Sequence, residues 1–299
     1  MPAAPSRNDK WIFSAYTCLL AVFWILAAAQ VEQAAGQLGV LETSARWRLI
    51  TGAAPWLALL PLGLGALAFT PLWPRLRGLG GRVFTGLGRL GWLNLAAALV
   101  AWGGLFALVF ALGNYARLLN LPWMRVFAGL LLGGLAGVFL AAAWPGRRRF
   151  PLWLIGLLLP AALYELLHVL PMLSAYPFSL DWSEGTWYYY ASTLFGRSLY
   201  GAELPLPYSH LTRSLLQAVP FLVPGLPLIV HRAWQALLMA GLPLLAAGLL
   251  TRRLRLPQAE WRAAAFLAGY LFINLGPVLY HLLPPVILLV IFTGIATPT

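Results

Sequence analysis

The chain has 299 residues, of which 61% are hydrophobic and only 9% charged, with a formal net charge of +12. A soluble domain carries about a quarter charged residues, so the composition excludes an ordinary soluble fold. Continuous apolar runs of about 20 residues, the length that a helix needs to cross a bilayer, recur along the chain. The chain is therefore expected to be all-α, a polytopic transmembrane helical bundle of about 7–8 spans.

In chain order, the predicted spans are 11–30, 49–72, 91–113, 123–145, 150–173, 231–250 and 262–280, with a further one from about residue 284. No convincing small-residue cleavage site follows the first span, so we interpret it as a retained anchor. Cys18, the only cysteine, lies within that span, which excludes an intrachain disulfide.

The basic residues are distributed unevenly between the two sides of these spans. Thirteen of the 20 precede the first span or lie in the loops after the second, fourth and sixth. By the positive-inside rule this asymmetry predicts a cytoplasmic N-terminus. The basic residues are then expected to meet anionic lipid headgroups, and nucleic acid is not expected as a partner.

Residues 1–149 form a predicted four-span scaffold, poor in ionisable groups within its spans. Gly129, Gly133 and Gly137 make a small-residue stripe in the fourth span, a pattern typical of close helix packing in lipid. Residues 150–299 differ because they contain one long extracytoplasmic loop, 174–230, with interfacial helices. A loop of this length between short ones is usually functional.

The loop opens with the segment 179–201, "SLDWSEGTWYYYASTLFGRSLYG". Its spacing predicts a short interfacial helix over 182–195, ended by Gly196. One face, expected in the lipid boundary, consists of Trp187, Tyr190, Ala191, Leu194 and Phe195. A neighbouring polar strip consists of Asp181, Glu184, Tyr188 and Ser192.

Further along the loop, the apolar stretch 215–230 is interrupted by three prolines, which argues against a regular span. A re-entrant or interfacial hairpin and a kinked extra helix both fit it.

Asp181 and Glu184 have two interpretations. An Asp at the N-cap with a Glu at N3 is close to a capping box, which could explain both residues. A carboxylate at an outer helix end could also accept a proton from an attacking hydroxyl, or bind a cation that holds a phosphate. The two roles do not exclude one another.

The segment also resembles the first large extracytoplasmic loop of GT-C membrane glycosyltransferases, in an overlap that spans about 150–280. The matching residues are Asp181, Tyr188, Tyr190, Ala191, Leu194, Gly196, Leu199 and Tyr200. The family usually has this loop after its first span, whereas here four spans precede the span that leads into the loop. The chain also has His210 where a proline is common. It resembles a truncated or a short, divergent member of the family, expected in a bacterial plasma membrane.

The resemblance implies transfer of a sugar from a polyprenyl-phosphate donor on the outer face, with membrane lipid around the site. It implies that Asp181 is the catalytic base, with Glu184 as its partner or substitute. The hairpin at 215–230 would hold the polyprenyl tail. No cofactor is certain, and a divalent cation stays open.

The other candidate site residues are ionisable or polar groups on the outer side. Three external arginines, Arg197, Arg213 and Arg232, are candidates for binding the phosphate of the sugar donor. The planar guanidinium holds its N–H groups in a fixed geometry that matches phosphate oxygens. His210 and Tyr188 are candidates for substrate binding. Glu165 and His168 form Glu-x-x-His on one helical face of a span, where ionisable groups are costly. A single such motif does not support a diiron site, and no metal site is predicted.

Two other functions stay open. The chain could be a non-catalytic accessory subunit that docks a membrane protein partner through its loop, with Asp181 and Glu184 only capping a helix. A transporter is less favoured, because the hydropathy pattern has no internal repeat.

Overall fold

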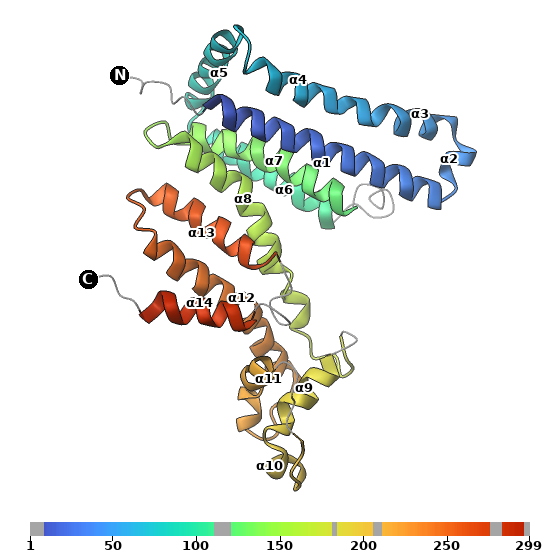
Figure 1. Cartoon of the computed structure of the whole chain (residues 1–299), viewed down its shortest axis with the longest axis vertical. Coiled ribbons are helices and arrows are strands. Elements are labelled where there is room, and N and C mark those ends of the chain that lie inside the picture. The colour runs from blue at the N-terminus through green and yellow to red at the C-terminus, as the bar shows by residue number, and fades with distance from the viewer. Residues whose placement is uncertain (1–8, 111–120, 181–183, 206–210, 276–282, 296–299) are drawn as a thin grey trace. The chain divides into compact units, whose positions relative to one another are not determined.

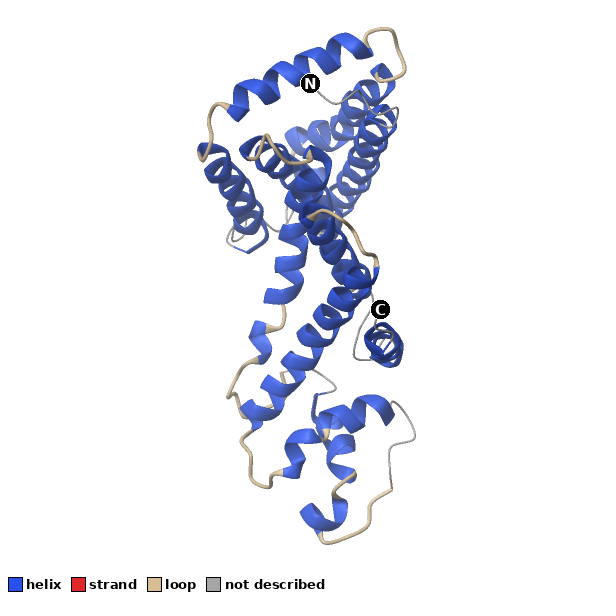
Figure 2. Cartoon of the chain, turned by 90° about the vertical axis from the view of Figure 1, so that its left-hand side faces the viewer, coloured by secondary structure: helices blue, strands red, loops and turns tan. Residues whose placement is uncertain are grey.

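The structure, a computed structural model, describes residues 9–110, 121–180, 184–205, 211–275 and 283–295. These residues form helices, turns and loops, without any strand (Figures 1 and 2). The chain divides into two compact units, Met1–Pro160 and Ala161–Thr299, with the division inside one helix. The boundary that we predicted from sequence lies at 149/150.

The first unit contains nine helical elements among its described residues. They are α1 (Asp9–Gln37), α2 (Val40–Thr43), α3 (Ala45–Ala53), η1 (Ala54–Ala58), α4 (Leu59–Leu67), α5 (Trp73–Gly88), α6 (Leu93–Phe110), α7 (Pro122–Ala143) and the first part of α8 (Arg149–Leu167).

The second unit begins within α8 and is built from shorter elements around one long helix. They are η3 (Leu170–Met172), α9 (Glu184–Thr193), α10 (Gly196–Tyr200), α11 (Leu211–Gln217), η4 (Val219–Leu222), α12 (Leu228–Arg253), α13 (Ala259–Ile273) and α14 (Leu283–Ile295).

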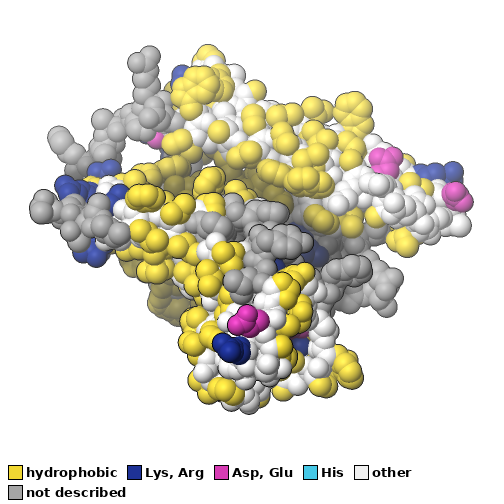
Figure 3. Space-filling view, turned by 60° about the horizontal axis from the view of Figure 1, so that its bottom comes forward, with side chains coloured by type: hydrophobic (Ala, Val, Ile, Leu, Met, Phe, Trp, Pro, Cys, Tyr) yellow, Lys and Arg dark blue, Asp and Glu magenta, His cyan; other side chains and the backbone are white. Residues whose placement is uncertain are grey.

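Five helices among the described residues are long and apolar enough to cross a membrane: Asp9–Gln37, Ala45–Leu67, Pro122–Ala143, Arg149–Met172 and Leu228–Arg253. A sixth results if the bent pair of α5 and α6 counts as one span. Hydrophobic side chains predominate on the face in Figure 3, where charged groups are few. An apolar exterior of this kind is expected for a protein that lies in lipid.

The two predicted spans near the C-terminus correspond to shorter helices. The helix α13 has 15 residues and α14 has 13. Both are below the about 20 residues that a perpendicular span requires.

In the first unit, α1 packs along α4 and α7, and α6 packs on α7 (Figure 1). Polar groups on α1 reach the backbone of its neighbours: Ser14 Oγ donates to the carbonyl of Gly65 at 2.9 Å, and Tyr16 Oη donates to that of Leu130 at 2.6 Å. In lipid such hydrogen bonds join helices that the hydrophobic effect cannot hold together.

The glycine stripe of α7 makes a close contact with α8. An added Cβ on Gly133 would approach the carbonyl oxygen of Leu157 to 3.0 Å, and one on Gly137 would collide with the carbonyl of Trp153. A Cβ on Gly156 of α8 would collide with the Gly137 backbone, whereas one on Gly129 would meet nothing within 4 Å. Two of the three predicted stripe residues therefore face α8.

The corner between α5 and α6 is held by specific contacts. The two helices are bent by 105°. Gly91 adopts φ 50°, a left-handed conformation that glycine tolerates. The side-chain amide of Asn94, 1% exposed, donates to the carbonyls of Leu87 at 2.7 Å and Gly91 at 3.2 Å. Asn94 thus adds a second hydrogen bond to each of these carbonyls, which also accept from the backbone amides of Leu90 and Asn94 respectively.

In the second unit, α12 packs against α13 and α14 on one side, and its N-terminal part contacts η3, η4 and α11. The helices α9, α10 and α11 cluster near this end of α12 (Figure 1). Trp234 Nε1 of α12 donates to the carbonyl of Leu216 at 2.7 Å, which ties α12 to the end of α11. The candidate site lies in this region.

Candidate functional site

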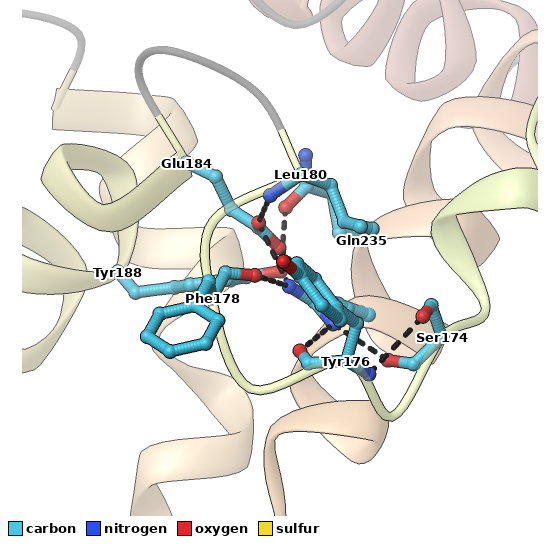
Figure 4. Close-up of polar contacts among 8 residues, drawn as sticks. Ser174, Tyr176, Phe178, Leu180, Glu184, Tyr188 and Gln235 are labelled. Carbon is cyan, nitrogen blue, oxygen red and sulfur yellow. Dashed lines mark hydrogen bonds and ion pairs between the residues drawn. The ribbon is translucent and has the colours of Figure 1, made fainter.

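Arg232, in the second turn of α12, is the central residue of the region and is 0% exposed. Its Nε donates to Oε1 of Glu184 at 2.7 Å, and its Nη2 donates to Oε2 at 3.0 Å. Nη1 donates to the carbonyls of Ser174 and Tyr176, both at 2.7 Å, and Nη2 also donates to that of Phe178 at 2.8 Å. These five bonds use all the N–H donors of a guanidinium (Figure 4).

Glu184, the first residue of α9, is 5% exposed and accepts from two directions. Besides Arg232, the backbone amide of Leu180 donates to its Oε2 at 2.6 Å. Burial would raise the pKa of this carboxyl, but the hydrogen bonds and charge of Arg232 and the bond from Leu180 outweigh burial and lower the pKa. Glu184 is therefore ionised at neutral pH, in a bidentate pair with Arg232.

Tyr188 lies one turn further along α9, beside the same pair. Its hydroxyl donates to Oε1 of Gln235 at 2.9 Å, and its ring packs against His231 with centroids 5.8 Å apart. Burial, and then the negative charge of Glu184, raise the pKa of the Tyr188 hydroxyl. Tyr188 therefore stays protonated and acts here as a hydrogen-bond donor.

The buried face of α11 adds a second arginine and an amide. Arg213 is 5% exposed, and its guanidinium lies 5.0 Å from the centre of the Trp187 ring, a cation–π geometry. Gln217 follows one turn later and is 1% exposed. Neither atom of its amide has a hydrogen-bond partner within the described parts of the chain, and the same holds for Nε2 of Gln235 and Nδ1 of His231.

We call this set the polar cluster; its members are Glu184, Tyr188, Arg213, Gln217, His231, Arg232 and Gln235. Buried polar atoms without partners cost free energy and are uncommon in folded proteins. Their concentration here marks the polar cluster as the candidate site.

An apolar groove of about 350 Å³ lies on a neighbouring face of α12. Its lining residues come from η4, from the turn before α12 and from α12 itself: Val219, Pro220, Leu226, Val230, Ala233, Trp234 and Leu237. Positions 230, 233, 234 and 237 have the spacing of one helical face. The first turns of α12 thus carry the apolar groove on one side and the polar cluster on another.

No family model matches the chain, and no curated protein or solved structure matches it either.

The structure brings together some of the sequence-predicted site residues. Glu184, Tyr188 and Arg213 belong to the polar cluster. Arg197 does not, because its side chain is 85% exposed and lies 3.8 Å from an equally exposed Glu203. Asp181 and His210 lie outside the described residues.

Glu165 lies near the end of α8 and is half-buried, whereas His168 directly follows the helix, in a turn, and is exposed. Within the described residues, no three His, Cys, Asp or Glu side chains gather in a way that could hold a metal ion.

Three expectations are corrected. The helix predicted to end at Gly196 ends at Thr193, and Gly196 begins α10. Trp187 and Ala191, expected to face lipid, are 8% and 0% exposed inside the protein, because α9 turns its acid-bearing side towards Arg232. Arg232, expected to hold a phosphate, has all its donors engaged within the protein.

Sequence reasoning missed Gln217 and Gln235 altogether, and assigned Arg232 the wrong role. One signal was available: an arginine at the start of an apolar helix needs an anionic partner, and the loop offered only three acids. The two glutamines carried no such signal, because an uncharged amide near a span end is common.

The Glu184 pair predicts a specific pH dependence of stability. Because the folded pKa of Glu184 lies below its unfolded value of about 4.3, the pair stabilises the protein at higher pH and this stability is lost as pH falls through the folded pKa. The melting temperature of the purified protein should therefore fall more steeply below about pH 5 than that of Glu184→Gln. Glu203→Gln, which removes an exposed acid, is the control and should keep the native slope. Equal slopes for the native chain and Glu184→Gln would contradict this prediction.

Proposed function

We propose that this chain is an integral membrane glycosyltransferase that transfers a sugar from a polyprenyl-phosphate donor to an acceptor on the extracytoplasmic face. The observation that carries the proposal is the apolar groove beside the polar cluster on the same turns of α12. An amphiphilic donor needs both surfaces, because its isoprenoid tail requires an apolar one and its phosphate and sugar require polar groups. The GT-C-like pattern around Asp181 supports the same function.

In this proposal the protein has seven or eight spans in a bacterial plasma membrane. The N-terminus is cytoplasmic, and 174–230 is extracytoplasmic. The donor tail lies in the apolar groove, which is formed in part by the hairpin 215–230.

Asp181 deprotonates or orients the attacking hydroxyl. Arg213 balances the charge of the leaving phosphate, because it is buried with Gln217 on one face of α11. Glu184 has a positioning role instead of a catalytic one. Its carboxylate accepts a hydrogen bond from the backbone amide of Leu180, the residue directly before Asp181.

One observation favours the second function, a non-catalytic accessory subunit. Glu184, half of the acidic pair on which the catalytic interpretation depends, is fully engaged with Arg232. If Asp181 also serves only the fold, the loop is a docking surface for a membrane protein partner.

The test is sugar transfer from labelled polyprenyl-phosphate sugars by the purified full-length chain. Ala233 is exposed in the apolar groove, so Ala233→Trp should fill the groove without disturbing the core. We expect it to lower kcat/KM roughly tenfold. Asp181→Asn keeps the capping geometry but removes the base, and should lower kcat by about 10²–10⁴-fold.

The matched control is Leu245→Trp, which places the same ring at a 50% exposed position of α12 outside the groove and should leave the rate unchanged. Transfer that is absent with every donor, or equal in the native chain and Asp181→Asn, would reject the glycosyltransferase and favour the accessory subunit.

A further inference from the structure

A second groove, in the first unit, has a basic lining and lies apart from the polar cluster in sequence. Its volume is about 580 Å³. The residues that line it are Gly78, Gly81, Arg82, Thr85, Gly86 and Arg89 of α5 and its end, together with Arg149 at the start of α8. We call it the basic groove.

The helix α5 is amphipathic, and its polar face lines the basic groove. Arg82 and Arg89 are two turns apart, with Thr85 between them, so they share one face. Leu79 and Val83 lie on another face and are 55% and 58% exposed. A helix with a cationic face and an exposed apolar face is typical of the membrane interface.

The corner after α5 supports the same placement. The apolar helix α6 leaves α5 at 105°, and Gly91 and Asn94 hold this corner. If α6 enters the membrane, α5 runs along the membrane surface. The positive-inside distribution puts this surface on the cytoplasmic side, where anionic lipids attract basic segments.

The charges in the basic groove are not balanced by its own lining. No acidic side chain is among the described residues that line it, whereas Arg77, on another face of α5, pairs with Asp9 at 3.0 Å. The Arg149 guanidinium lies over the ring of Phe84, 5.0 Å from the ring centre, in a cation–π contact. Three guanidinium groups around one groove suit a phosphate, which arginine binds through two parallel hydrogen bonds.

The glycines give a headgroup access to the helix backbone. A Cβ added to Gly78, Gly81 or Gly86 would meet nothing within 4 Å, so this face of α5 is open. Side chains at these positions would instead occupy the basic groove.

We propose that the basic groove binds the phosphodiester headgroup of an anionic phospholipid. Arg82, Arg89 and Arg149 hold the phosphate, and the acyl chains lie against the exposed apolar face of α5. The adjacent apolar surface identifies the ligand as a lipid, because a free phosphate would not use it.

The test is a titration of the full-length protein, in a zwitterionic detergent, with phosphatidylglycerol or phosphatidylcholine, followed by native mass spectrometry. The native chain should bind phosphatidylglycerol more tightly than phosphatidylcholine. The triple change Arg82→Gln, Arg89→Gln and Arg149→Gln should weaken phosphatidylglycerol binding roughly a hundredfold, since each arginine near a membrane surface contributes roughly a fivefold gain in affinity. The matching triple change to lysine keeps the positive charges but loses the paired N–H donors of arginine. It should weaken phosphatidylglycerol binding by less.

The matched control is Arg252→Gln, Arg255→Gln and Arg262→Gln, which removes three exposed arginines from the same predicted side, outside the basic groove. It should bind phosphatidylglycerol like the native chain. The proposal is overturned if this control loses affinity as much as the groove variant, if the native chain does not distinguish the two lipids, or if inorganic phosphate at equal concentration displaces the lipid. Melting temperatures near the native value identify the variants that are folded.

Discussion

Replacing Arg232 by methionine is expected to lower the free energy of unfolding by about 3–5 kcal/mol, because it leaves the buried carboxylate of Glu184 without its counter-charge. The change also removes the donor from three backbone carbonyls, those of Ser174, Tyr176 and Phe178. Methionine keeps an unbranched apolar side chain, so the loss reflects charge and hydrogen bonding more than packing. Unfolding of the purified protein in detergent, followed by circular dichroism, measures it.

The double variant Arg232→Met, Glu184→Gln separates the pair from its surroundings. Since the residual cost of the single change lies in the uncompensated charge, the double variant should be more stable than Arg232→Met alone. Arg197→Met is the control, because that arginine is 85% exposed and should leave stability unchanged. Equal losses for Arg232→Met and Arg197→Met would show that the buried pair does not support the fold.

Replacing Gly156 by leucine should separate α7 from α8 and lower the free energy of unfolding by about 3 kcal/mol. This is the upper end of the range that is typical when a side chain is forced into a packed contact. A Cβ at this position already collides with the backbone of Gly137, which cannot rotate away as a side chain could. The carbonyl of Gly156 also accepts a hydrogen bond from Trp102 Nε1 at 3.0 Å, and this bond would be displaced with the helix. Thermal unfolding in detergent is the measurement.

Gly129→Leu is the matched control, because it makes the same chemical change on α7 where a Cβ meets nothing within 4 Å. It should be neutral or slightly stabilising, since glycine is the poorer helix former. A loss as large as that of Gly156→Leu would mean that leucine is costly anywhere in these helices, and that the close contact is not the cause.

The sequence was sufficient to predict helices, their membrane character and the approximate position of the long ones. The glycine stripe of α7 was also visible, but its partner was not. Gly156 stands alone in α8 without a stripe of its own, so nothing in the local pattern marks it as the residue that meets Gly137. Spacing within one helix identifies a face, whereas the neighbour of that face depends on the whole packing arrangement.

The segment 73–88 was not predicted as a helix, because five of its 16 residues are glycine and three are arginine. Glycine lowers helix propensity by about 1 kcal/mol per residue, so the pattern resembles a loop. The amphipathic arrangement of its apolar and basic residues, and contact with α7, outweigh that local preference. The 105° corner to α6 depends on Asn94, whose bonding role has no sequence signature.

In the candidate site, the sequence indicated Glu184, Tyr188 and Arg213, but not how they are used. Glu184 and Arg232 are 48 residues apart, so no helical spacing relates them. The described residues of the polar strip, Glu184, Tyr188 and Ser192, pack inward. The cost of burying Arg232 is offset only when an acid meets it, and Glu184 is that acid. Capping logic was partly right: Glu184 does reach back to a backbone amide, that of Leu180.

Arg232 holds the segment from Ser174 to Phe178 by its main-chain oxygens and makes no hydrogen bond to its side chains. Tyr176 and Phe178 themselves are 54% and 68% exposed. Any residue supplies the same carbonyl, so amino-acid replacements at these two positions should leave the path of the segment unaltered. During evolution, related proteins could thus change which molecules this stretch touches while inheriting its shape.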